Sequence, residues 1–147
     1  MTRVHDLAAI KRALVGLDLV PAIEAGFVAL SEGRANVPPV GELILDKGEV
    51  HIKYGAIAGD DRYVVKIASG FYGNAARGLD SGNGLMLLFD QETGVPTDVL
   101  LDGGHLTDMR TALAALAQQR ASLGGKTAVV VLCGANIALD KLKAILP

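Results

Sequence analysis

Two basic side chains occupy positions that are unfavourable for a positive charge unless an anion lies nearby. Lys66 falls inside the apolar run 64–67, where an unpaired ammonium either gives up its proton or binds a partner. Arg110 falls in the predicted first turn of a helix, where the helix dipole disfavours cations by roughly 0.3–1 kcal/mol. A carboxylate held between the two would relieve both costs. A lysine with a lowered pKa could also transfer a proton.

Each cation also has a purely structural explanation. Lys66 could lie on an edge strand, where its stem covers apolar surface and its ammonium reaches water. Arg110 could pair locally with Asp108 on the helix surface. Asn74 lies among glycines, which is typical of a residue that holds a turn, and Thr107 has the position of a helix N-cap. The sequence alone leaves these explanations open.

The composition excludes several classes of protein. The chain has 147 residues, of which 50% are hydrophobic and 20% charged, so we expect one globular domain with a real core. A net charge of -2 and the lack of a basic stripe argue against nucleic-acid binding. The single cysteine, Cys133, excludes an intrachain disulfide and fits a reducing compartment. No membrane span, signal peptide or metal-ligand spacing is evident, and we therefore expect a soluble, cytoplasmic protein without a metal site.

The hydrophobic pattern predicts an α+β fold. Two helices open the chain, the second beginning near Asp18 with Pro21 in its first turn and ending at Gly33. A strand-rich middle follows, and its connections are too short for parallel crossovers, so we expect a mostly antiparallel sheet packed with helices. The strands are expected at 42–46, 49–54, 63–69, 84–90 and 95–101, followed by a helix over 107–122 and a C-terminal strand–helix unit.

The chain resembles the N-terminal part of the ornithine cyclodeaminase/mu-crystallin family over about residues 17–117. The resemblance rests on the joint occurrence of six short segments, which is far more specific than any one of them. They are residues 31–34 with 37–39 (SEGR and VPP), 50–55 (VHIKYG), 66–74 (KIASGFYGN), 81–85 (SGNGL), 88–90 with 93–94 (LFD and TG) and 106–112 (LTDMRTA).

This resemblance implies a domain that binds substrate and forms a homodimer in NAD(P)-dependent enzymes of small amino or imino acids. It implies that Lys66 holds the substrate carboxylate or donates a proton, that Arg110 binds the same carboxylate, and that Thr111 lies near the nicotinamide. Many members carry an arginine where this chain has Val40, and Lys53 could replace that missing charge. Asn74 is a further candidate for substrate binding.

The C-terminal residues depart from the family pattern. The family continues into a Rossmann domain, whereas no Gly-x-Gly-x-x-Gly opens a helix after a strand here. Residues 125–147 instead resemble the C-terminal end of threonine/serine dehydratases, without the Schiff-base lysine or the phosphate loop, so we do not expect pyridoxal phosphate. We assign residues 1–124 to the substrate and dimerisation domain and residues 125–147 to an appended strand–helix tail of the same compact unit.

These observations lead to two hypotheses about function. The first is a homodimeric substrate-binding module for a small carboxylate such as an amino or imino acid, with no cofactor bound by this chain alone and no hydride transfer of its own. The second is an active cyclodeaminase, ketimine reductase or alanine dehydrogenase type of enzyme, whose cofactor domain is supplied by a partner. A scaffold without any ligand is a third possibility.

Overall fold

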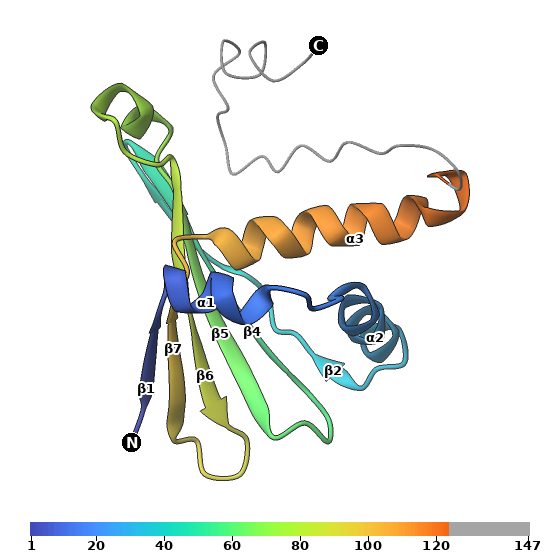
Figure 1. Cartoon of the computed structure of the whole chain (residues 1–147). Coiled ribbons are helices and arrows are strands. Elements are labelled where there is room, and N and C mark those ends of the chain that lie inside the picture. The colour runs from blue at the N-terminus through green and yellow to red at the C-terminus, as the bar shows by residue number, and fades with distance from the viewer. Residues whose placement is uncertain (124–147) are drawn as a thin grey trace.

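A computed structural model describes residues 1–123, and a seven-stranded sheet is its central element (Figure 1). Every strand pair is antiparallel except the parallel pair of β1 and β7, so the predicted α+β class and mostly antiparallel sheet are confirmed. The sheet order is β1 (Arg3–Asp6), β7 (Pro96–Leu101), β6 (Gly82–Asp90), β5 (Arg62–Gly70), β4 (Gly48–Ile57) and β2 (Ala35–Asn36), with β3 (Gly41–Leu45) also paired to β4.

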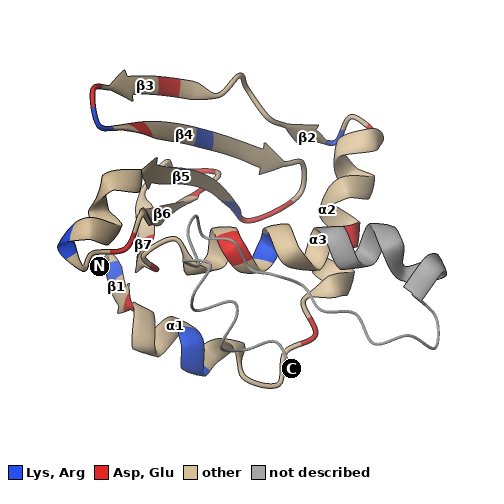
Figure 2. Cartoon of the chain, turned by 90° about the horizontal axis from the view of Figure 1, so that it is seen from above, with Lys and Arg blue, Asp and Glu red and all other residues tan. Residues whose placement is uncertain are grey.

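The helices α1 (Leu7–Leu14), α2 (Val20–Ser31) and α3 (His105–Leu123) lie on one side of the sheet (Figure 2). The predicted start of α2 is confirmed, because Pro21 lies in its first turn and the Asp18 carboxylate accepts a hydrogen bond from the Val20 amide at 3.1 Å. Gly33, with φ of 72°, adopts a left-handed conformation just beyond the helix end. Within the described residues, no helix is both long and apolar enough to cross a membrane.

Four parts of the predicted element pattern differ from the described structure or fall outside it. Strand β1 was not predicted, and the stretch 70–82, which we expected to be irregular, contains a short 3-10 helix, η1 (Tyr72–Arg77). Helix α3 begins at His105, two residues before the predicted start. The C-terminal strand and helix that we predicted within residues 125–147 lie outside the described residues.

The two faces of the sheet differ in what covers them. Side chains alternate between the faces of a strand, so the paired residues Lys53, Lys66 and Met86 share one face, which is the face under the helices. No described helix covers the opposite face (Figure 2). That bare face is rich in apolar side chains, among them Val4, Leu43, Val50, Ile52, Tyr54, Val65, Ile67, Leu85, Leu87, Val99 and Leu101.

Few hydrophobic side chains are fully enclosed. Of those described, only Ile10, Ala29 and Ala114 are buried, while on the bare face Val4 is 65% and Leu43 is 55% exposed. A contiguous apolar face of this kind usually marks a surface that another protein surface covers.

A charge cluster holds strand β1 at the edge of the sheet. Asp98 on β7 is 5% exposed, and Arg3 donates hydrogen bonds to its two carboxylate oxygens at 2.8 and 2.9 Å. His5 Nε2 lies 2.9 Å from Asp98 Oδ1. The hydrogen bonds from Arg3 and then His5 hold the pKa of Asp98 far below its ordinary value. The cluster therefore links residues that are more than ninety positions apart in the chain.

We predict that Asp98→Asn lowers the thermal midpoint by several degrees at pH 7, because the ion pair that holds β1 is lost. A carboxyl whose pKa is depressed by folding stabilises the folded state fully above its unfolded pKa, near 3.8, and loses that contribution as the pH falls below it. Urea unfolding should therefore show a difference between wild type and variant that shrinks as the pH falls from about 5 towards 2.

The matched control is Asp46→Asn in the exposed turn between β3 and β4. It should leave the midpoint and its pH dependence unchanged. A wild-type-like pH profile for Asp98→Asn would show that the cluster contributes nothing to acid sensitivity.

Candidate functional site

A cavity of about 620 Å³ lies between helix α2, the covered face of the sheet and helix α3. Three cations that the sequence singled out line it from three different elements: Lys53 on β4, Lys66 on β5 and Arg110 on α3. The fold therefore brings together residues that are far apart in the sequence. Asp60, in the turn between β4 and β5, is the one acidic residue in the described lining.

Lys66 lies on a central strand. It pairs with Lys53 on one side and Met86 on the other, so the edge-strand explanation for this lysine is wrong. The side chain is half-buried, and burial lowers the pKa of Lys66, with smaller contributions from the positive charges of Lys53 and Arg110. The negative charge of Asp102 acts in the opposite direction and raises this pKa. An anion in the cavity would likewise favour the charged form of Lys66.

Arg110 lies two residues further into its helix than we predicted. Because α3 begins at His105, the guanidinium belongs to the second turn, where the field of the helix N-terminus has largely fallen off. The alternative explanation, a local ion pair, is not observed, since the described residues form no ion pair between Asp108 and Arg110. The Arg110 side chain is exposed, so it is free to reach a ligand in the cavity without first breaking an ion pair.

Asp102 is a buried residue that the sequence analysis missed. It is 1% exposed, and its Oδ2 accepts a hydrogen bond from the Leu106 amide at 2.9 Å. Its carboxylate therefore caps the start of α3, and our assignment of that role to Thr107 was wrong. The same carboxylate acts electrostatically on Lys66, so one buried group contributes both to the start of the helix that carries Arg110 and to the charge of the neighbouring lysine.

A pair of glycines makes this arrangement possible. Gly103 and Gly104 follow Asp102 with φ of 59° and 90°, conformations that residues with a side chain rarely adopt. The turn they form lets the chain reverse directly from β7 into α3. The His105 amide donates to the Asp102 carbonyl at 3.0 Å, which closes this turn.

The other predicted site residues have different surroundings. The Thr111 hydroxyl, next to Arg110 in the sequence, donates to the Thr107 carbonyl at 2.8 Å within α3. The Asn74 side-chain amide donates to the Asp80 carbonyl at 3.1 Å, which supports the turn-holding explanation. Neither Asn74 nor Thr111 lines the cavity of the three cations.

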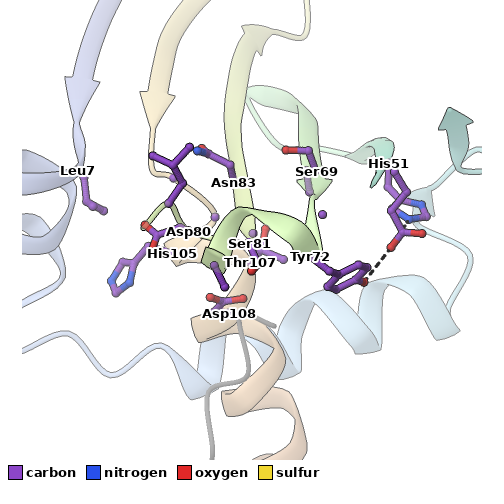
Figure 3. A pocket seen from close by; sticks show the side chains of 18 of the residues that line it. Leu7, His51, Ser69, Tyr72, Asp80, Ser81, Asn83, His105, Thr107 and Asp108 are labelled. Atoms are coloured by element: carbon purple, nitrogen blue, oxygen red, sulfur yellow. Dashed lines mark hydrogen bonds and ion pairs between the residues drawn. The ribbon is translucent and has the colours of Figure 1, made fainter. Parts of the chain in front are cut away.

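A second cavity, of about 720 Å³, lies under the loop that carries η1 (Figure 3). Its lining is more polar and includes Tyr72, whose hydroxyl donates to Glu49 Oε1 at 3.2 Å. His51 Nε2 lies 3.6 Å from the same carboxylate. Burial raises the pKa of Asp108, which also lines this space. Within residues 1–123 there is no group of three His, Cys, Asp or Glu residues that could hold a metal ion.

The comparison with known protein families agrees with the resemblance found in the sequence. The family model described as the ornithine cyclodeaminase/mu-crystallin family matches residues 1–136. The chain belongs to this family. The match continues past residue 124, where we placed a domain boundary, and that boundary stays a prediction.

Two curated proteins that are similar to this chain are named as a dehydrogenase and a cyclodeaminase. A Rhizobium meliloti protein named as a dehydrogenase is 36% identical over 142 residues, which cover 93% of this chain and 43% of the relative. An uncharacterized cyclodeaminase of Sinorhizobium fredii is 41% identical over 123 residues, which cover 76% of this chain and 37% of the relative. The chain thus spans less than half the length of these relatives.

Solved structures of this family share the fold described above. An archaeal alanine dehydrogenase dimer with bound NAD superposes with a TM-score of 0.70 at 26% identity. The superposition covers 77% of this chain and 34% of that structure. The shared part is therefore a domain-sized portion of a longer enzyme.

We predict that Asp102→Ala lowers the free energy of unfolding by about 1 kcal/mol or more. The variant removes the buried carboxylate that accepts the hydrogen bond from the Leu106 amide at the start of α3. Calorimetry or urea unfolding would measure the loss. Asp102→Asn keeps the shape and an acceptor oxygen, so it should recover most of the stability. Equal destabilisation by both variants would show that the charge and not the cap is what matters.

Proposed function

We propose that this domain binds the carboxylate of a small amino or imino acid between Lys66 and Arg110. The observation that carries the proposal is the convergence of Lys53, Lys66 and Arg110 on one cavity from three separate elements. Burial lowers the pKa of Lys66, and the nearby positive charges of Lys53 and Arg110 lower it further. A bound anion would offset these effects, which supports an anion site in this cavity. Arg110 can bind both oxygens of a carboxylate at once, and Lys66 supplies a point charge beside it.

Lys53 has a specific part in this proposal. In the family pattern an arginine follows the paired prolines, whereas this chain has Val40 there. Lys53 is the register partner of Lys66 on the adjacent strand, so its ammonium can supply the positive charge that Val40 does not. The anion would then be bound by one cation from each of β4, β5 and α3.

We propose further that two copies of the domain associate through the bare face of the sheet. The apolar side chains on that face have no covering element among the described residues. One related structure is described as a dimer. Burial of the two faces against each other would remove the apolar surface from water, which is the main driving force for association.

The wider activity that we propose is that of an NAD(P)-linked enzyme of amino or imino acids. The alternative to a purely binding role is that Lys66 exchanges a proton with the bound substrate, and its lowered pKa favours this role. The sequence has no dinucleotide fingerprint after a strand, so these residues do not account for cofactor binding and we derive no step through it. Proximity of Thr111 to the nicotinamide and a cytoplasmic location stay predictions.

We predict that pyruvate binds to the purified chain and that binding draws a proton onto Lys66. The bound anion raises the lowered pKa of Lys66. At a pH near the pKa that Lys66 has in the ligand-free protein, the protein therefore takes up protons on binding. Isothermal titration calorimetry in two buffers of different ionisation enthalpy measures this uptake. Arg110→Ala should weaken binding at least tenfold, and Lys66→Met should also remove the proton uptake.

Arg77→Ala, an arginine in η1 outside the cavity, is the matched control and should bind like wild type. Absence of binding by pyruvate and by every small amino or imino acid tried, or equal binding by Arg110→Ala and wild type, would contradict the proposal.

We predict that Ile52→Glu on the bare face weakens self-association at least tenfold, because it places a charge in an apolar interface. Analytical ultracentrifugation over a range of concentrations measures the dissociation constant. The control is Ile44→Glu on β3. Ile44 is 64% exposed, and its pairing with Glu49 places it on the opposite face of the sheet from Ile52. A wild-type chain that stays monomeric at high concentration would contradict the dimer.

A further inference from the structure

The cavity of the three cations has a second, apolar part. Helix α2 presents Ile23, Phe27 and Leu30 to it, spaced along one side of the helix. The sheet contributes Val64 and Leu88, which pair with each other one row along from Lys66 and Met86. One region of the lining is thus cationic, and the larger remainder is hydrocarbon.

The size of this cavity exceeds what a three-carbon acid requires. About 620 Å³ lies within the range that holds ligands of drug size, on the order of 300–1,000 Å³. If the carboxylate of an amino acid lies against Lys66 and Arg110, its side chain has α2 and the Val64–Leu88 row as neighbours. Water in such an apolar space is readily displaced by a hydrocarbon chain.

Among the residues that the structure describes, the lining offers no clear partner for a second ammonium group. Asp60 and Arg62 both line the cavity from the region of the β4–β5 turn, and both are exposed. Their opposite charges leave that region without a net negative field. A terminal ammonium group on the ligand would lose its hydrating water and contact hydrocarbon instead, which is unfavourable.

We infer that the ligand of this site is an amino or imino acid with an extended apolar side chain and not a diamino acid. The inference rests on the proposed carboxylate site, and it adds the chemical class of the ligand's side chain. Phe27 is the specificity-determining residue, because it lines the apolar part of the cavity from α2.

The test compares three L-amino acids by calorimetric titration of the full chain. Norleucine and ornithine have side chains of the same length, which end in a methyl group and an ammonium group respectively, while alanine has only the first carbon. We expect norleucine to bind about 50-fold more tightly than alanine, because each buried methylene contributes about fourfold. Ornithine should bind no better than alanine.

Two variants on α2 complete the test. Phe27→Ser should reduce the preference for norleucine over alanine at least fivefold and leave the affinity for alanine nearly unchanged. Val28→Ser is the matched control, because Val28 has a similar exposure, 48% against 46% for Phe27, but does not line the cavity. Its preference for norleucine should equal that of wild type.

The outcomes separate this inference from the proposed function. Binding of all three amino acids that depends on Arg110, with ornithine equal to or tighter than norleucine, would overturn the apolar side chain and leave the carboxylate site intact. Equal effects of Phe27→Ser and Val28→Ser would remove α2 from the site. Absence of binding by all three, and of the pyruvate binding described above, would overturn both proposals.

Discussion

The placement of a lysine in the middle of a sheet is the constraint on which the site depends. Lys66 has a strand on each side, so it cannot avoid its neighbours by moving to an edge. Its register partner is a second lysine, and α3 brings an arginine to the same cavity. Burial lowers the pKa of Lys66, the neighbouring positive charges lower it further, and only Asp102 among the named neighbours opposes these effects. The fold therefore maintains a cationic region that an anion would stabilise.

The patterned parts of the fold could be predicted from the sequence, because they are set by local rules. The antiparallel strands β3 to β7 have short connections and apolar runs, and α2 has a proline at its start and a glycine at its end. Strand β1 could not be predicted in this way, since Arg3 to Asp6 shows no apolar alternation and its partner lies in β7. Its position depends on Asp98, whose burial and ion pairs arise only in the folded chain.

The site shows the same division between local and long-range information. Lys66 could be selected because a lysine is unusual inside an apolar strand. Arg110 was selected for a position in the first turn of a helix, whereas the structure places it in the second turn. Asp102 could not be selected, since an aspartate before two glycines is typical of an ordinary turn. Its importance comes from burial and from the amide of Leu106, which no local pattern reveals. Asn74 was selected because it is close to Lys66 in sequence, and its amide donates a hydrogen bond to the Asp80 carbonyl within its own loop.

The glycine turn between β7 and α3 gives the site an unusual route for evolutionary change. A side chain at Gly104 would meet only ordinary contacts, with backbone atoms of Asn83 3.7 to 3.8 Å away, so the obstacle to substitution there is conformational and not steric. A replacement that relaxed the left-handed backbone would tilt α3 and carry Arg110 with it, while the strands that hold Lys66 stayed in register. Ligand selectivity in this lineage could thus shift through a residue that never touches the ligand.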